Sequence, residues 1–93
     1  MALLGIDIGT TGCKVVVCRE SGKELARAYR EYACVISESR IDLDPELVFA
    51  RVLDCIGEVR TLIRARDIRA ISVSSMTDNV TPIGSDGMPL LPS

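Results

Sequence analysis

The chain has 93 residues, which suits one small domain, and its composition is that of a globular protein. A net charge of −2 and an aromatic content of 3% argue against a nucleic-acid-binding surface of basic and stacking side chains. No apolar stretch approaches the ~20 residues of a membrane span, and no basic region precedes the first apolar run. We therefore expect a cytoplasmic protein that binds neither nucleic acid nor membrane.

The chain opens with two predicted strands, residues 3–8 and 13–19, whose connection is rich in glycine and threonine. Four connecting residues carry groups that can bind phosphate: Gly9, Thr10, Thr11 and Gly12. The glycines allow positive φ angles and have no β-carbon to keep an anion away, while the threonines offer hydroxyl donors. Because a strand follows instead of a helix, the spacing differs from a Walker A loop and predicts a phosphate-binding hairpin. An ordinary glycine-rich hairpin is the alternative.

Two charged residues flank this turn and extend the phosphate-binding interpretation. Asp7 ends the first strand, where a carboxylate can hold a hydrated Mg2+ ion. Lys14 begins the second strand, where its ammonium can pair with a terminal phosphate. The pattern therefore predicts a site for a metal-bound polyphosphate at this end of the strands, with a solvated lysine as the alternative.

The four cysteines have no C-x-x-C spacing, and the chain has no histidine to complete a zinc site, so we expect reduced thiols. Cys13 lies in the candidate phosphate turn, where electropositive surroundings would make it reactive, although a neutral spacer is the other interpretation. The remaining three sit in apolar patterns and are expected to pack as small hydrophobes: Cys18, Cys34 and Cys55.

The middle of the chain is predicted to hold a third strand over residues 24–35, a polar loop over residues 36–43 and a helix from Pro45 to about Ala65. Asp44 supplies an N-cap acceptor, and proline suits the first helical position. An apolar stripe follows one side of this helix at spacings of three and four residues: Val48, Val52, Ile56, Val59 and Ile63. The helix would be ~30 Å long, which is enough to cross a sheet.

Residues 68–74 form another predicted strand, followed by a polar turn over residues 75–79 and a hairpin over residues 80–91. A crossover helix of this length makes the new strand run parallel to an earlier one. If its neighbour is the first strand, Asp7 and the polar turn face one crevice at the carboxyl edge of the sheet, where open α/β sheets bind ligands. Otherwise Asp78 is an ordinary turn former.

The run G-I-D-I-G-T-T-G-C-K at residues 5–14 resembles the first phosphate motif of the actin-like ATPase superfamily. The order of elements that follows resembles domain I of the FGGY carbohydrate kinases. Three further stretches are similar in order and spacing: the turn at Ser21 and Gly22, the helix start at residues 44–46, and residues 71–89 with their S-D-G-M-P run.

This resemblance implies an α/β fold of the ribonuclease H-like, actin-like ATPase type, with a mixed sheet and one long crossover helix. It implies that residues 1–93 are the N-terminal part of domain I, with the rest of that domain, a second domain and the catalytic base beyond Ser93. The implied function is that of a kinase that transfers the γ-phosphate of ATP to a hydroxyl of a small carbohydrate or polyol, with Mg2+ as the metal. Residues 1–93 alone are then expected to be inactive.

The same resemblance implies roles for single residues. Asp7 helps to place Mg2+, and Thr77 and Asp78 occupy the place where the family contacts substrate hydroxyls. Five residues of the hairpin are implied to bind the β- and γ-phosphates: Gly9, Thr10, Thr11, Gly12 and Lys14. Glycerol kinases have an Arg-Glu pair at the substrate position and xylulose kinases a Met-His pair, so this sequence does not name the sugar.

Two other protein types share the opening motif and remain as alternatives. Activator ATPases of the 2-hydroxyacyl-CoA dehydratase type need cysteines for an iron–sulfur cluster, and Hsp70 or bacterial-actin modules continue differently over residues 20–35.

Packing adds one further expectation. One long helix leaves a face of the sheet uncovered, so the isolated segment should self-associate through that face or an open strand edge, or be marginally stable.

Overall fold

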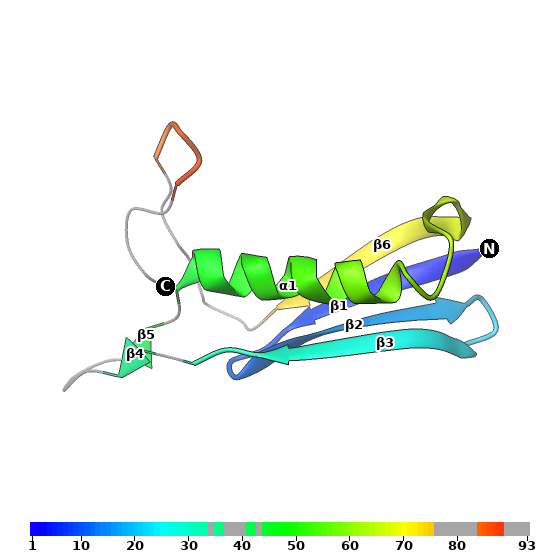
Figure 1. The fold of residues 1–93 in the computed structure, drawn as a ribbon, viewed down its shortest axis with the longest axis horizontal. Coiled ribbons are helices and arrows are strands. Elements are labelled where there is room, and N and C mark those ends of the chain that lie inside the picture. Colours follow the sequence, from blue (N-terminus) through cyan, green and yellow to red (C-terminus); the bar gives the residue numbers. More distant parts are fainter. Residues whose placement is uncertain (34, 37–40, 43, 76–83, 89–93) are drawn as a thin grey trace.

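A computed structural model describes residues 1–33, 35–36, 41–42, 44–75 and 84–88 of the chain. Four strands form a mixed sheet in the order β3-β2-β1-β6 (Figure 1). Their bounds are Ala2–Ile8 for β1, Gly12–Arg19 for β2, Glu24–Glu31 for β3 and Ile68–Ser75 for β6. The first three form an antiparallel meander, and β6 pairs in parallel with β1. The predicted mixed α/β arrangement is therefore confirmed, and β6 is a neighbour of β1.

Side chains alternate between the two faces of the sheet, as the two-residue period of a strand requires. On β2, Cys13, Val15 and Val17 are buried, whereas Lys14 and Val16 on the other face are partly exposed. Buried side chains of the neighbouring strands, of the helix and of the residue after β3 complete the core: Ala2, Leu4, Ala26, Ala28, Tyr32, Val52, Cys55 and Val59. The core thus lies on one face of the sheet.

The helix α1, Pro45–Val59, crosses this face and packs mainly on β2 and β3 (Figure 1). Its start follows the prediction. The Asp44 side chain accepts a hydrogen bond from the N–H of Glu46 at 3.0 Å, and proline occupies the first turn. Of the predicted apolar stripe, Val52 and Val59 are buried. The amphipathic pattern therefore identified the face that packs on the sheet.

The end of α1 differs from the prediction. The helix stops at Val59 rather than near Ala65, and the N–H of Leu62 bonds the carbonyl of Val59 at 3.0 Å in a tighter turn. A short 3-10 helix, η1 Ala65–Asp67, then leads into β6. Ile63 still packs against the core although it lies after the helix. The apolar periodicity therefore continued past the residue where the helix ends.

Two other boundaries differ. β3 ends at Glu31 rather than at residue 35. A short antiparallel pair, β4 (Val35–Ile36) and β5 (Ile41–Asp42), begins at the last residue of the predicted strand and continues into the predicted polar loop. In this pair Ile36 lies opposite Ile41, and both are β-branched residues that favour strands. The polar residues around them led to the prediction of a loop. Residues 84–88 form a tight turn at the centre of the predicted final hairpin, and the remaining residues of that prediction lie outside the described residues.

Within the described residues β6 lies at an edge of the sheet, and α1 leaves it uncovered. Ile71 and Val73 pair with Leu4 and Ile6 of β1, so they project to the same face as the helix. They are nevertheless 64% and 60% exposed. Among the described strands of this sheet, β1 and β2 hold the inner positions. No helix among the described residues is long and apolar enough to cross a membrane.

Candidate functional site

The turn between β1 and β2 is closed by backbone hydrogen bonds and held by a tyrosine. The N–H of Gly9 donates to the carbonyl of Gly12 at 2.9 Å. The buried hydroxyl of Tyr32 reaches the carbonyls of Gly9 and Gly12, the latter at 3.0 Å. The N–H of Tyr32 also donates to the carbonyl of Thr11 at 3.1 Å. The predicted hairpin is present. Its contact with Tyr32, which follows β3, was not predicted from the sequence.

The glycines of the turn provide space rather than an unusual backbone angle. Glycine allows a positive φ, but neither Gly9 nor Gly12 adopts one. A β-carbon on Gly12 would stand 2.6 Å from Cζ of Tyr29 and 2.8 Å from the carbonyl oxygen of Arg30. Gly12 therefore allows β3 and its tyrosine ring to approach the turn closely.

A row of polar side chains crosses the sheet beside this turn, on the face opposite α1. Asp7 of β1 pairs with Lys14 of β2, Lys14 pairs with Tyr29 of β3, and Asp7 pairs with Ser74 of β6. Paired residues of adjacent strands project to the same side, so these side chains are neighbours. The structure thus brings together the predicted metal residue and the predicted lysine, and adds a hydroxyl on either side of them.

A shallow hollow of about 250 Å³ lies in the same face of the sheet. Its described lining comprises Gly5, Ile6, Asp7, Lys14, Val16, Ser72 and Ser74. A β-carbon on Gly5 would meet no atom within 4 Å, so this glycine adds to the open space. One carboxylate, one ammonium and two hydroxyls around the hollow make a donor set that fits a hydrated Mg2+ with an anionic ligand, because Mg2+ takes few protein carboxylates and keeps several waters.

The remaining predicted site residues are two threonines of the turn and two residues that follow β6 in the sequence. Thr10 and Thr11 are exposed at the tip of the hairpin. Ser75, the last residue of β6, pairs with the last residue of β1, so the carboxyl ends of these two strands adjoin. Thr77 and Asp78 come shortly after this edge and lie outside the described residues.

Cys13 belongs to the core rather than to the polar row. It is buried on the helix face, and its Sγ lies 3.8 Å from Sγ of Cys55 on α1. Burial, assisted by the hydrogen bond with Cys13, raises the pKa of the Cys55 thiol to about 11. Cys18 is also a free thiol, so the prediction of reduced cysteines is confirmed for these three. Cys34 lies outside the described residues.

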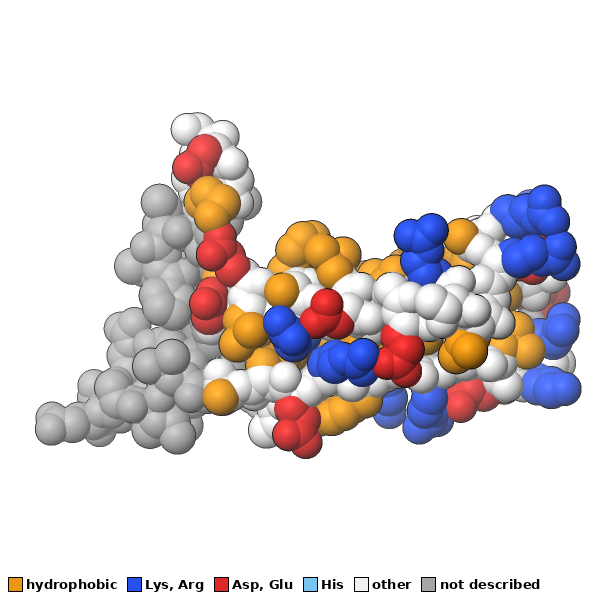
Figure 2. Space-filling model, in the orientation of Figure 1, with side chains coloured by type: hydrophobic (Ala, Val, Ile, Leu, Met, Phe, Trp, Pro, Cys, Tyr) orange, Lys and Arg blue, Asp and Glu red, His pale blue; other side chains and the backbone are white. Residues whose placement is uncertain are grey.

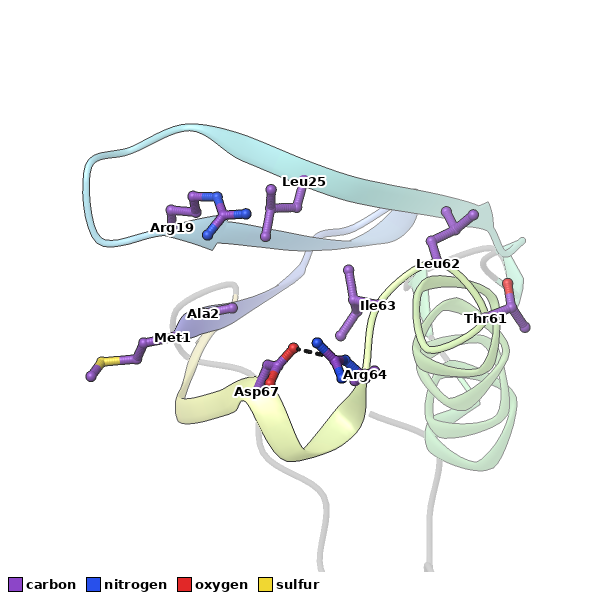
Figure 3. Close-up of a pocket in the computed structure, with 9 residues that line it drawn as sticks. All are labelled: Met1, Ala2, Arg19, Leu25, Thr61, Leu62, Ile63, Arg64 and Asp67. Atoms are coloured by element: carbon purple, nitrogen blue, oxygen red, sulfur yellow. Dashed lines mark ion pairs between the residues drawn. The ribbon is translucent and has the colours of Figure 1, made fainter.

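The opposite end of the sheet carries a larger hollow of about 460 Å³. Figure 3 shows its lining, which includes Met1, Arg19, Leu25, Ile63, Arg64 and Asp67. Lys and Arg side chains gather at this end of the molecule (Figure 2). Arg64 is paired with Asp67 at 3.5 Å, so the carboxylate of this hollow is already engaged by a guanidinium. The hollow beside Asp7 is therefore the better candidate for a metal-bound phosphate.

Comparison with known proteins identifies the family of the chain. Residues 2–93 match the N-terminal domain of the FGGY family of carbohydrate kinases. The chain is 31% identical over 91 residues to a gluconokinase of Bacillus subtilis and 28% identical over 79 residues to a glycerol kinase of Beutenbergia cavernae. These matches include 97% and 82% of the chain but only 18% and 16% of the two relatives. The chain therefore spans less than a fifth of their length.

A solved structure agrees with the sequence matches. The crystal structure of gluconate kinase from Lactobacillus acidophilus superposes with a TM-score of 0.88 at 30% identity, over 98% of this chain and 18% of that protein. The mixed sheet with its crossover helix is thus part of the actin-like ATPase fold of the sugar kinases. On these grounds the chain belongs to the FGGY family of carbohydrate kinases, through the N-terminal domain of that family.

Proposed function

We propose that residues 1–93 begin domain I of a cytoplasmic, ATP-dependent carbohydrate kinase, and that the β1–β2 hairpin binds the phosphate tail of Mg-ATP. The observation that carries this proposal is the direct pairing of Asp7 with Lys14 beside the turn of residues 9–12. It sets a carboxylate for the cation next to an ammonium for the phosphate. Activator ATPases and Hsp70-type modules are set aside because the family match extends over residues 2–93.

In this proposal each group has one task. Asp7 holds a hydrated Mg2+, and Lys14 pairs with a terminal phosphate oxygen. Gly9 and Gly12 shape the turn, and the β- and γ-phosphates take N–H and hydroxyl donors from Thr10, Thr11 and Gly12, because the N–H of Gly9 is bonded to the carbonyl of Gly12. When bound, Mg2+ neutralises charge on the transferred phosphoryl group. The acceptor is a hydroxyl of a small carbohydrate or polyol that contacts Thr77 and Asp78. The base that takes its proton lies outside residues 1–93, so this segment alone is inactive.

A phosphorylation screen of the protein expressed from its complete reading frame tests the proposal. Radiolabelled ATP is offered with ketopentoses, ketohexoses, gluconate and polyols, and we expect Mg2+-dependent transfer to at least one acceptor. Absence of both transfer and Mg-ATP binding would overturn the kinase function.

The substrate role of Asp78 needs its own variant in the same assay. Asp78→Ala should abolish turnover and leave nucleotide binding unchanged, because the carboxylate accepts hydrogen bonds from substrate hydroxyls. Asp54→Ala on the exposed side of α1 is the control for loss of one carboxylate. Unaffected sugar kinetics in Asp78→Ala would remove this residue from the substrate site.

We also propose that residues 1–93 self-associate when isolated. An apolar groove of about 490 Å³ runs beside α1 toward β6, and its aliphatic lining comprises Leu4, Ile56, Val59, Ile63, Ile68 and Ile71. A second copy would remove this surface and the exposed edge of β6 from water. Sedimentation should show dimers or larger species that dissociate on dilution. A well-behaved monomer with a cooperative melt would contradict the proposal.

A further inference from the structure

A buried hydroxyl lies at the base of the hairpin and has no task in the roles given above. Tyr32 is only 7% exposed and follows directly after β3. Its hydroxyl reaches the carbonyls of Gly9 and Gly12, and its N–H donates to the carbonyl of Thr11. One residue therefore contacts three of the four carbonyls in the turn of residues 9–12.

These contacts determine which way the peptide groups of the turn face. In a trans peptide, the N–H of one residue points away from the carbonyl of the residue before it. No described peptide bond is cis. Because the Gly9 carbonyl is turned toward Tyr32, the N–H of Thr10 points outward from the core. The partly negative carbonyl oxygens are thereby kept on the inner side, away from an anion that approaches the turn.

The glycine at position 9 makes a side-chain restraint useful. Glycine passes readily between backbone conformations because it has no β-carbon, so the peptide between Gly9 and Thr10 can flip and present its carbonyl outward. A hydrogen bond from a phenol held in the core opposes that flip.

We infer that Tyr32 is a positioning residue for the phosphate hairpin. The carbonyls of Gly9 and Gly12 share the single proton of its hydroxyl and are held inward, so that the turn presents N–H groups rather than carbonyl oxygens to the nucleotide phosphates. The inference rests on the proposed function, because it takes a phosphate chain as the ligand of the hairpin.

Tyr32→Phe tests this inference, because it removes the hydroxyl and keeps the ring. In the protein from its complete reading frame, the Kd for Mg2+ with AMP-PNP, a non-hydrolysable ATP analogue, should rise about five- to tenfold, the effect of losing roughly one hydrogen bond. The Kd for AMP, which lacks the β- and γ-phosphates, should not change. Hydrogen exchange should accelerate at residues 9–13 and stay unchanged along α1.

Thr61→Val is the matched control. The hydroxyl of Thr61 donates to the carbonyl of Glu58 at 2.7 Å just after α1, so the variant removes the same kind of bond at a distant place. Both nucleotide affinities should match those of the wild type.

The outcomes separate the inference from the proposed function. A wild-type protein that does not bind Mg2+ with AMP-PNP would overturn the function and the inference together. A wild type that binds, with Tyr32→Phe binding equally well, would overturn the inference alone. Equal weakening of AMP and AMP-PNP would indicate a general structural role and would also overturn it.

A second variant applies where Tyr32→Phe does not fold. Difluorotyrosine at position 32 keeps the ring and the hydroxyl but loses its proton at a lower pH than tyrosine. Affinity for Mg2+ with AMP-PNP should then fall as the pH rises through that ionisation, because a phenolate cannot donate a hydrogen bond. An affinity that follows the wild-type pH profile would overturn the inference.

Discussion

The ring of Tyr29 occupies the space in which a β-carbon on Gly12 would stand. That carbon would lie 2.6 Å from Cζ of Tyr29 and 2.8 Å from the carbonyl oxygen of Arg30. We expect Gly12→Ala to destabilise the protein by about 1–3 kcal/mol, the usual cost of forcing atoms into filled space. Adding Tyr29→Ala should recover only part of this loss, because the backbone carbonyl of Arg30 remains.

Gly5→Ala is the matched control for this pair, since a β-carbon there would meet no atom within 4 Å. Its melting temperature should stay the same or rise slightly, because alanine suits a strand interior better than glycine. Thermal unfolding of the three variants decides the question. If Gly12→Ala were as stable as Gly5→Ala, the space beside the hairpin would not be filled as described.

Asp7→Asn keeps the shape of the side chain and removes its charge. In the complete protein, the Mg2+ concentration for half-maximal activity should rise by about tenfold or more, because a neutral amide replaces the carboxylate ligand. Glu24→Gln is the control, since Glu24 is an exposed carboxylate bonded to Arg27 at 2.9 Å. Undiminished activity of Asp7→Asn at low Mg2+ would be incompatible with the metal role.

The raised pKa of Cys55 predicts a loss of stability at alkaline pH. Burial lifts the pKa from 9.0 to about 11, so the stabilising contribution is complete below pH 9. It is lost as the pH rises through 11, because the unfolded chain releases its proton first. The melting temperature should fall between these values, and Cys55→Ala should flatten the fall. Identical pH curves for the wild type and Cys55→Ala would contradict this account.

Asp44 should stabilise the start of α1 through its cap. Asp44→Ala removes the acceptor for the Glu46 N–H and should cost about 1 kcal/mol, whereas Asp44→Ser keeps a hydroxyl acceptor and should cost less. Chemical denaturation measures both. Equal stability of Asp44→Ala and the wild type would show that the cap contributes nothing.

Features that depend on neighbouring residues could be predicted from the sequence. The glycine-threonine turn and the Asp44 cap are read from adjacent residues, and the parallel return of β6 follows from the length of the crossover. The end of α1 could not be predicted, because Ile63 keeps its apolar spacing while packing from a turn. For β3 and α1, local chemistry thus located the start better than the end.

The contribution of the two tyrosines could not be predicted, because it depends on strand register. Lys14 pairs with Tyr29 across β2 and β3, and the N–H of Tyr32 meets Thr11 in continuation of that ladder. A shift of one residue would have turned both rings to the opposite faces. The residues near the turn do not indicate how β2 and β3 are aligned. The sequence therefore could not place Tyr29 and Tyr32 at the site.

The order of the strands also has a consequence for synthesis on the ribosome. β1, β2, β3 and α1 contact one another within the first part of the chain, whereas β6 returns to β1 only after the helix has been made. We expect the nascent chain to shape its hairpin around Tyr32 before β6 leaves the exit tunnel, because local contacts form first and domains fold from the N-terminus during translation. Force profiling with arrest peptides would show compaction of the stalled chain before residue 68 emerges. The strand that adjoins Asp7 would then dock onto a turn that is already built.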